Sequence, residues 1–453
     1  MENDKVTTMT GSTKSANLTS FTELSDPVLA SLRRVEADIH SGEHQAAAAR
    51  LNELQRQSPN DPRVLMTGVM LAQSIGNAEG ALRAVEKAVV IAPRWAPALI
   101  ELAAQLARRG EFERALVEAD KAVAAAPSSL QVLEPATSIA NLAGDTDRAA
   151  RYLDLAQQAA PDSLPVRLSR GYNLLARRQF DDALKVFSAA LETDAESELA
   201  LAGRARAALE SGDLTAASGY YEDLARRDPD NAAYRYYADI SQGKSPTAQP
   251  PEIARTLFDD YAATFDKHLV GQLGYRAPKR FAEVIRKHRP DLVFDMLDLG
   301  CGTGLMGVYL GKPRGGLVGV DVSGAMIAEA IKHNIYDRFH QVNLLDALRE
   351  SPSGSFDVIT AADVFVYIGA LDEAITNAKR LLRPNGLFAF SCEATGPGEP
   401  DMVLRPTQRY AHSEASMRAL CAAAGFSSVE IEACNIRYEE GEATPGFIVV
   451  AIA

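Results

Sequence analysis

The chain has 453 residues, of which 47% are hydrophobic, and its formal net charge is −13. This length exceeds the usual size of one domain, so two or more domains are expected. The acidic balance disfavours nonspecific binding to nucleic acid or to an anionic membrane surface, because both need a basic face, and we predict neither partner.

Residues 1–27 are polar, rich in Ser and Thr, and lack the apolar core of a signal peptide. We predict a disordered leader over this stretch. No apolar run in the sequence reaches the roughly 18 residues that a membrane-spanning helix needs. The four cysteines form no C-x-x-C pair, so we expect a reducing, cytoplasmic setting and no metal site.

Three sets of residues then recur every 34 positions between residues 28 and 231. A stacked helix-turn-helix unit explains all three: a Gly ends the first helix, an Ala lets two helices approach closely, and a Pro stops the second helix. The positions are Gly42, Gly76, Gly110, Gly144 and Gly212, with Arg178 as the exception; Ala47, Ala81, Ala115, Ala149, Ala183 and Ala217; and Pro59, Pro93, Pro127, Pro161 and Pro229, with Ala195 as the exception.

This pattern resembles the tetratricopeptide repeat (TPR) family and predicts six repeats over residues 28–231, with a capping helix at 232–243. Pro135 falls inside the first helix of the fourth repeat and is expected to kink or shorten it. The resemblance implies a concave surface that holds a protein or peptide partner. The alternative is that the array is a stabilising or dimerising appendage.

Residues 241–251 are rich in Ser, Gly, Gln and Pro and separate two differently patterned regions. We place a linker at 244–251 and a second domain at 252–453. From Leu292 onward, short apolar runs alternate with helical segments, which is typical of a mostly parallel sheet. The runs cover residues 292–299, 316–322, 339–343, 356–364 and 386–393.

Two closing runs, 429–439 and 446–453, have only the turn EGEATPG between them. They should pair antiparallel, because a parallel return needs a crossover of a dozen or more residues. The fold class is therefore predicted as an all-α TPR solenoid followed by an α/β, Rossmann-like, mostly parallel seven-stranded sheet with an antiparallel terminal hairpin.

A glycine loop, DLGCGTG at residues 298–304, follows the first strand and precedes a helix, which is the context of a nucleotide-binding loop. Its glycines stand at alternate positions, and Leu305 stands where a dinucleotide-binding loop would carry its third Gly. Asp321 closes the second strand 23 residues after Asp298, the spacing of an acid that accepts hydrogen bonds from ribose hydroxyls. Met326 follows in the segment DVSGAM.

These motifs resemble the class I S-adenosylmethionine-dependent methyltransferases, and the whole chain is similar to predicted members that carry an N-terminal TPR array. The resemblance implies S-adenosylmethionine as cofactor. Asn343 and Leu344 would hold the adenine, with Asp346 as the rival. Tyr261 and Phe265 would cover the cofactor, unless both rings belong to the core. The cofactor-binding set is Asp298, Gly300, Cys301, Gly302, Gly304, Asp321, Val322, Met326, Asn343, Leu344, Ala362, Asp363, Tyr261 and Phe265.

Methyl transfer needs alignment above all, and it needs a base only when the acceptor must lose a proton. His412 is the candidate base by residue type, although a lone His is more often structural. Asp363 and Tyr367 complete the predicted catalytic set, and Glu393 and Arg409 are further candidates for the acceptor wall.

Two functions stay open at this stage. The first is an enzyme that methylates a protein, peptide or small metabolite, in which the repeats recruit or shape access for the acceptor, or serve only for oligomerisation. The second is a TPR scaffold that binds the cofactor without catalysis. The intact glycine loop and Asp321 favour the enzyme, because a decayed site would be free to lose them.

Overall fold

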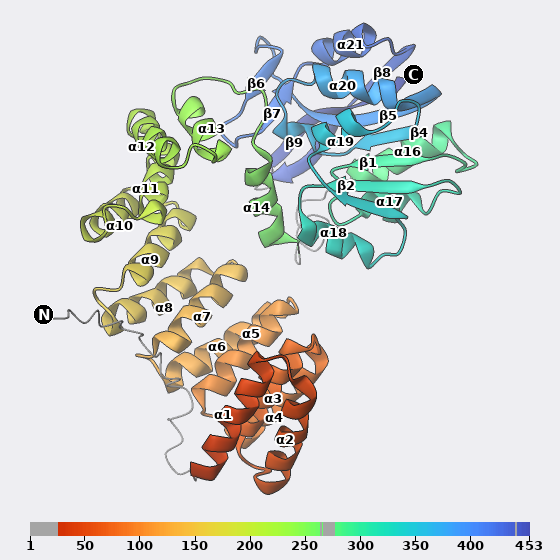
Figure 1. Ribbon diagram of the computed structural model, residues 1–453. Coiled ribbons are helices and arrows are strands. Elements are labelled where there is room, and N and C mark those ends of the chain that lie inside the picture. The colour runs from red at the N-terminus through yellow and green to blue at the C-terminus, as the bar shows by residue number, and fades with distance from the viewer. Residues whose placement is uncertain (1–25, 263–264, 266–276, 440–441) are drawn as a thin grey trace, which may run out of the picture. The chain divides into compact units, whose positions relative to one another are not determined.

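The computed structural model describes residues 26–262, 265, 277–439 and 442–453 (Figure 1). The chain divides into two compact units between Gly203 and Arg204, inside the helix α11 (Glu198–Ser211). The first unit is built of helix pairs, and the second combines further helices with a sheet. Among the described residues, no helix is long and apolar enough to cross a membrane.

Helix pairs follow one another through the first unit, as the 34-residue period predicts (Figure 1). The second helix of each pair carries a fully buried Ala from the predicted set, such as Ala81 and Ala115, so that its partner approaches closely. The pairs are α1 (Asp26–His40) with α2 (His44–Gln57), α3 (Pro62–Ser74) with α4 (Ala78–Ile91), α5 (Ala96–Arg108) with α6 (Phe112–Ala125), α7 (Leu130–Leu142) with α8 (Thr146–Ala159), and α9 (Leu164–Ala176) with α10 (Phe180–Thr193).

The residue that ends the first helix of each pair adopts the left-handed conformation. Gly76, Gly110 and Gly144 have φ angles of 71°, 72° and 74°. Arg178 takes the same conformation with a φ of 58°, although it carries a Cβ. The predicted solenoid of helix pairs is therefore confirmed, with Arg178 as its one strained stop.

Pro135 does not shorten α7, which has 13 residues like α5 and α9. Of the two expected effects, shortening is therefore contradicted, and a kink stays a prediction. The buried side chains of Val132, Leu133 and Ala136 on either side of the proline hold the helix in place, and this packing offsets the missing backbone hydrogen bond.

The second unit contains a mixed sheet whose strands run in the order β3-β2-β1-β4-β5-β9-β8. The first five are parallel, and β9 runs antiparallel to both β5 and β8, so the predicted terminal hairpin is confirmed. The strands are β1 (Met296–Leu299), β2 (Leu317–Asp321), β3 (Arg338–Gln341), β4 (Phe356–Ala361), β5 (Leu382–Ala394), β8 (Ser428–Glu439) and β9 (Glu442–Ile452).

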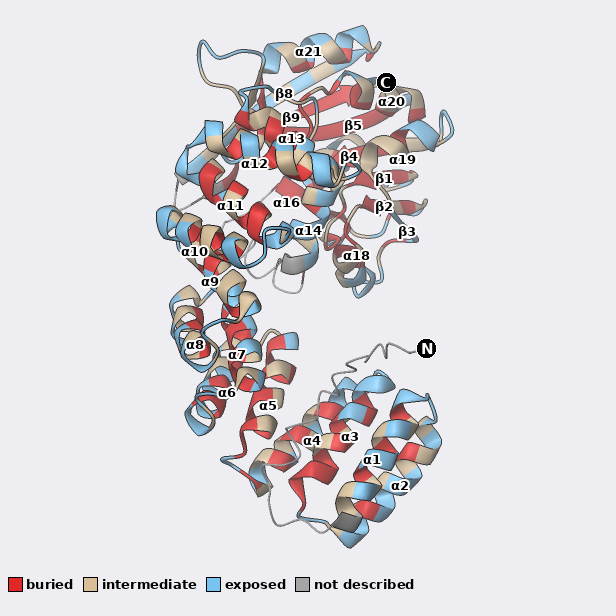
Figure 2. Cartoon of the chain, turned by 60° about the vertical axis from the view of Figure 1, so that its left-hand side comes forward, coloured by how far each residue is buried: buried red, intermediate tan, exposed pale blue. Residues whose placement is uncertain are grey.

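Alternate residues of the central strands face two separate hydrophobic clusters, as the two-residue period of a strand requires. Leu297 and Ile359 belong to the cluster with α20 (Asp372–Leu381) and α21 (Glu414–Ala423). Met296 and Val358 belong to the cluster with α16 (Ala277–His288). Burial on both faces makes β4 and β5 mostly red in Figure 2.

Most of the predicted turn EGEATPG is strand, because β9 already begins at Glu442. Pro445 pairs with Asn435 beyond Gly446, where the register of β9 against β5 ends. On that side no strand partner needs the missing N–H of the proline, so the strand continues through it. A short hairpin of β6 (Met402–Leu404) and β7 (Tyr410–His412), absent from the prediction, pairs with the end of β5.

The unit also contains α12 (Leu214–Arg227), α13 (Ala232–Ser241) and α14 (Pro251–Tyr261). The proline-bearing segment between α13 and α14 is held against the sheet domain by its backbone. Gly369 and Ala370 donate to the carbonyl of Thr247 over 2.8 and 2.9 Å, and Gln249 N–H donates to the carbonyl of Tyr367 over 2.9 Å. We call residues 246–250 the strap.

Candidate functional site

A cavity opens where the carboxyl ends of β1, β2 and β4 meet, the edge at which ligands bind in open α/β sheets. Its wall combines the glycine loop, the residues after β2, β3 and β4, the strap and α14. The lining residues from the predicted set are Asp298, Gly300, Cys301, Gly302, Asp321, Val322, Met326, Asn343, Leu344, Ala362, Asp363, Phe265 and Tyr367.

The glycine loop turns sharply into α17 (Leu305–Leu310), and its three glycines all have positive φ. A Cβ on Gly300 would meet a side-chain carbon of Val364 at 2.1 Å, so only Gly fits there. At Gly302 a Cβ would meet nothing within 4 Å, so the backbone itself faces open space in the cavity. Gly304, which does not line the cavity, instead packs against Ala330 and Tyr336.

Asp298 lies at the bottom of this loop and is 1% exposed. Tyr336 donates to one carboxylate oxygen over 2.6 Å and Thr360 donates to the other over 2.7 Å. Burial nevertheless raises the pKa of Asp298 to about 6, because desolvation outweighs these two hydrogen bonds. A cationic ligand group would favour the charged form.

Asp321 stands at the end of β2, also nearly buried. Its carboxylate oxygens accept hydrogen bonds from Gly302 N–H at 2.8 Å and Ser323 N–H at 2.9 Å. Burial raises the pKa of Asp321 in spite of these donors. Each oxygen has a second lone pair, so the carboxylate can still accept from a pair of ligand hydroxyls.

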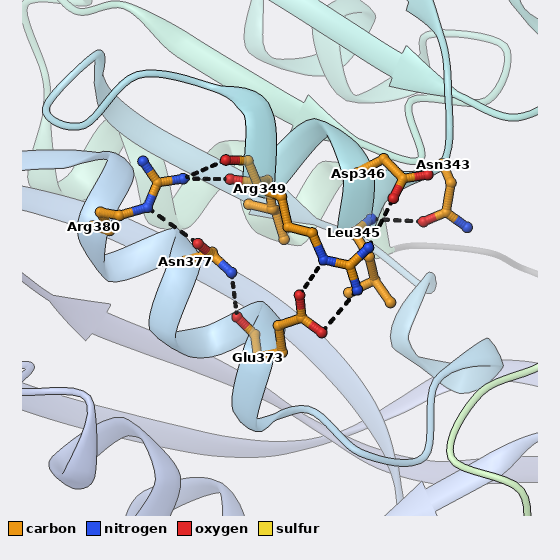
Figure 3. Close-up of polar contacts among 8 residues, drawn as sticks. Asn343, Leu345, Asp346, Arg349, Glu373, Asn377 and Arg380 are labelled. Atoms are coloured by element: carbon orange, nitrogen blue, oxygen red, sulfur yellow. Dashed lines mark hydrogen bonds and ion pairs between the residues drawn. The ribbon is translucent and has the colours of Figure 1, made fainter.

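Asn343 and not Asp346 lies in the cavity wall. Asn343 caps α19 (Leu344–Glu350), accepting from Leu345 N–H over 2.7 Å, and Leu344 lines the cavity beside it. Asp346 instead bonds Arg349 over 2.9 Å, and Arg349 also pairs with Glu373 of α20 (Figure 3). Asn343 is therefore the residue at the cavity. Asp346, the alternative candidate for the adenine contact, belongs to an ion-pair network at the surface.

The helix α14 covers one side of the cavity with aromatic side chains. Phe258 lines the cavity and meets the ring of Phe265 at 5.9 Å and that of Tyr367 at 5.8 Å, both edge to face. Asp259 ties the helix to the end of β2, because Ser323 Oγ donates to it over 2.6 Å. The side chain of Tyr261 lies outside the described residues.

The cavity is also lined by Asp363, Tyr367, Arg409 and Arg437, a group that we call the polar end. Asp363 follows β4 with a φ of 56°, and its N–H donates to Ser391 Oγ over 2.8 Å. Burial raises the pKa of Tyr367, so its phenol stays neutral at physiological pH. This end therefore offers a carboxylate, a phenol and two guanidinium groups to a second ligand.

His412 does not belong to the cavity wall. It sits in β7 at 2% exposure, and its Nε2 bonds the carbonyl of Gly369 at 2.9 Å. Burial lowers the pKa of His412, which is therefore neutral at pH 7. The structure therefore places His412 outside the cavity lining, and a catalytic role for it stays a prediction. Glu393, another candidate, is likewise outside the lining.

Four further residues contribute to the site although the sequence did not single them out. Tyr336 holds Asp298, Phe258 extends the aromatic face, Arg437 bonds Asp363, and Gln249 of the strap lines the cavity. Only Phe258 had a sequence signal, because it lies three residues before Tyr261 on the same helix face.

Two family models match the chain. Residues 297–388 match a methyltransferase domain, and residues 174–237 match tetratricopeptide repeats. The chain thus carries a methyltransferase domain together with tetratricopeptide repeats, as the sequence resemblance implied. The first match covers the glycine loop, Asp321 and Asp363, so it coincides with the cavity.

Several curated relatives are named as methyltransferases. A ubiquinone biosynthesis O-methyltransferase of Pasteurella multocida is 29% identical over 108 residues, 21% of this chain and 45% of that protein. A malonyl-[acyl-carrier protein] O-methyltransferase of Geobacter sulfurreducens is 28% identical over 201 residues, 39% and 71% of the two chains. The chain spans about half the length of most of the curated relatives that it matches.

Among solved structures, a Burkholderia thailandensis 1,6-didemethyltoxoflavin-N1-methyltransferase aligns with a TM-score of 0.36 and 20% identity. The alignment covers 46% of this chain and 92% of that one.

Proposed function

We propose that this chain, which joins a methyltransferase domain to a tetratricopeptide array, transfers the methyl group of S-adenosylmethionine to an acceptor bound beside Asp363 and Tyr367. One observation carries the proposal. A single cavity is lined by the buried carboxylates and the glycine loop and also by a further set of polar side chains, Asp363, Tyr367, Arg409 and Arg437. A cofactor and an acceptor would thus meet within one enclosure.

The residues present suit S-adenosylmethionine. Asp321 offers acceptor lone pairs to two ribose hydroxyls, and Asp298 offers a carboxylate to the ammonium group of the amino-acid end. Val322 and Met326 supply an apolar surface for the adenine. The open space above Gly302 lets a ligand touch the backbone.

The cofactor would supply a methyl group activated by its positively charged sulfur. The chain's own residues then have three tasks, which are to align the acceptor, to exclude water and to take any proton that the acceptor must lose. Phe258 and Phe265 suit the second task, because their rings close one side of the cavity. Asp363 suits the third, because its carboxylate lines the acceptor end.

Isothermal titration of the full chain with S-adenosylmethionine and with S-adenosylhomocysteine tests the cofactor half of the proposal. Transfer of a labelled methyl group to fractionated lysate then tests the enzyme half. We expect saturable binding of both compounds and at least one labelled product. Binding without any transfer would favour a scaffold that uses the cofactor as a structural ligand, and no binding would overturn the proposal.

We further propose that the repeat array recruits or shapes access for the acceptor, which would then be a protein or peptide. The support is the match of residues 174–237 to a repeat family whose members form concave binding surfaces. Removing α1–α10 should then lower turnover on a macromolecular acceptor and leave turnover on a small mimic of the methylated group unchanged. Equal loss on both would contradict recruitment, and no loss would point to a small-metabolite enzyme.

A further inference from the structure

The carboxylate of Asp363 belongs to a buried network of charged side chains. Arg437 donates to Asp363 Oδ1 over 3.0 Å and also pairs with Glu393. The side chain of Arg437 is 2% exposed, that of Glu393 7%, and that of Asp363 16%. Asp363 is therefore the member of the network that lies nearest to open space.

The network brings together three strands that are distant in the sequence. Asp363 follows β4, Ser391 and Glu393 belong to β5, and Arg437 belongs to β8. Ser391 fixes the backbone of Asp363 and Arg437 fixes its carboxylate. Together they hold a left-handed backbone conformation that is unfavourable for a residue other than glycine.

Such an arrangement costs stability, because three charged groups are taken out of water. An ion pair that served stability alone would not require a strained backbone at Asp363. It would also not require the Asp363 carboxylate to line the cavity. Strained, buried and polar positions of this kind cluster at functional sites. The arrangement therefore suits a carboxylate that must be presented in one orientation.

A second hydrogen-bond acceptor lies in the cavity wall, on a residue whose backbone is bonded to Tyr367. Gln249 of the strap lines the cavity, and its Oε1 is buried without a hydrogen-bond partner among the described residues. Leaving a buried amide oxygen unpaired is unfavourable, because the oxygen has lost its bonds to water. A ligand that brings an N–H or O–H group would relieve that cost.

We propose that Arg437 is a positioning residue that holds Asp363 to accept a proton, and that the methyl acceptor is a hydroxyl or amine group. This inference rests on the proposed methyl transfer. A lone pair of the acceptor oxygen or nitrogen forms the bond to the methyl carbon. The bond from that carbon to sulfur breaks with its electron pair going to sulfur, and the acceptor's proton passes to Asp363 Oδ2.

Other acceptor classes suit this end less well. A carboxylate or a thioether brings no proton for Asp363 and no donor for Gln249. A carboxylate would also lie next to the negative charge of Asp363. A hydroxyl or a neutral amine brings a proton for Asp363, and a primary amine has a second N–H for Gln249.

An acceptor panel tests the acceptor class. The full chain is supplied with labelled S-adenosylmethionine and with phenols, catechols, alcohols, amines, carboxylic acids, thiols and thioethers. We expect labelled ethers or methylamines. Labelled esters or sulfonium products without any ether or amine would overturn the inference, and so would a chain that binds cofactor but methylates nothing in the panel. Absence of cofactor binding would instead overturn the proposed function.

A double-mutant cycle tests the role of Arg437. Arg437→Met should lower kcat on the best panel compound by tenfold or more and change the cofactor Kd by less than threefold. Arg437→Lys should recover part of kcat. In an Asp363→Asn background, Arg437→Met should cause no further loss, because it acts through Asp363.

Arg280→Met is the matched control, because Arg280 pairs with Glu432 on the same strand β8 but at the surface. It should leave kcat and Kd unchanged. If the effects of Arg437→Met and Asp363→Asn multiply, or if Arg437→Lys recovers nothing, Arg437 has only a structural role. If Arg437→Met does not fold, the double-mutant cycle is measured with Arg437→Lys in its place.

Discussion

The buried position of Asp298 lowers the stability of the protein when no ligand is bound, because a carboxylate loses its hydration there. The pKa of Asp298, about 6 in the folded state, lies above the ordinary 3.8. Between those values the folded state holds the proton more tightly than the unfolded chain does. The free energy of unfolding therefore falls as pH rises through this window. A ligand that brings a positive charge or a hydrogen-bond donor would favour the charged form of this buried carboxylate.

We therefore expect Asp298→Asn to raise the free energy of unfolding at pH 7 by on the order of 1 to 3 kcal/mol and to weaken cofactor binding. The gain should shrink towards pH 4, where the wild-type carboxyl is protonated. Denaturant titration at both pH values measures it. Asp337→Asn is the control of opposite sign, because Lys312 holds the pKa of Asp337 below its usual value and its loss should destabilise at pH 7.

A second prediction at the scale of single residues concerns Asp321. Asp321→Ala should weaken cofactor binding by about 1.5 to 3 kcal/mol, the value of hydrogen bonds to a charged group. Titration calorimetry measures the change. Asp346→Ala serves as the control, since Asp346 is paired with Arg349 outside the cavity wall. An unchanged Kd for Asp321→Ala would mean that Asp321 does not hold the ribose.

The predicted residues that line the cavity include those tied to strand ends. Asp298, Gly302 and Asp321 could be found because a strand followed by a turn fixes them in space without reference to the rest of the chain. Arg437 and Gln249 reach the cavity only through pairing with distant segments, and no local pattern marks them. His412 was chosen by residue type, and type alone says nothing about which side of β7 it occupies.

At the scale of elements, the repeats show how one backbone position decides a helix end. Five first helices stop at a glycine and the sixth stops at Arg178, all with positive φ. The left-handed conformation costs a non-glycine residue about 1 to 2 kcal/mol. The guanidinium of Arg178, 5.8 Å from the ring of Phe180, offsets part of that cost.

Arg178→Gly should consequently stabilise the repeats by up to about 1 kcal/mol, after allowance for the greater freedom of glycine in the unfolded chain. Thermal or urea unfolding of the full chain measures the effect. Gly144→Ala, at the equivalent position of the preceding repeat, should be destabilising. A loss of stability for Arg178→Gly would show that the contact with Phe180 outweighs the backbone strain.

The elements that sequence missed are those with few residues or with backbone bonds only. The strands β6 and β7 have three residues each, too few to show an alternating pattern. The strap binds through the N–H and carbonyl groups that every residue carries, so its composition looks like that of a free connection. The longer strands and the helix pairs, whose periods repeat many times, could be predicted.

At the scale of the whole molecule, the division between Gly203 and Arg204 puts α12 and α13 in the same compact unit as the sheet. Tyr410, fully buried in β7, donates to the carbonyl of Pro246 over 2.8 Å. Burial, together with the neighbouring Tyr410, raises the pKa of Tyr236 in α13. Tyr410 thus holds the start of the strap and lies close to Tyr236 of the preceding helix.

A truncation series follows from this division. A fragment that begins at Glu198 should fold and bind S-adenosylmethionine with the affinity of the full chain. A fragment that begins at Pro251 lacks the strap and α13, so it should be less stable and bind more weakly. Calorimetry and thermal unfolding compare the two. Equal affinity and stability for both fragments would show that the strap is dispensable.

The strap also has a consequence for how such proteins recombine. An exchange of repeat arrays between relatives, by evolution or by design, preserves the wall of the cavity only if the crossover falls upstream of the strap. A crossover within the Pro- and Gln-rich sequence would join two apparently complete halves and leave the receiving domain without Gln249 and its neighbours. The strap has the composition of a linker, and it is the place where a junction would remove residues from the cavity wall.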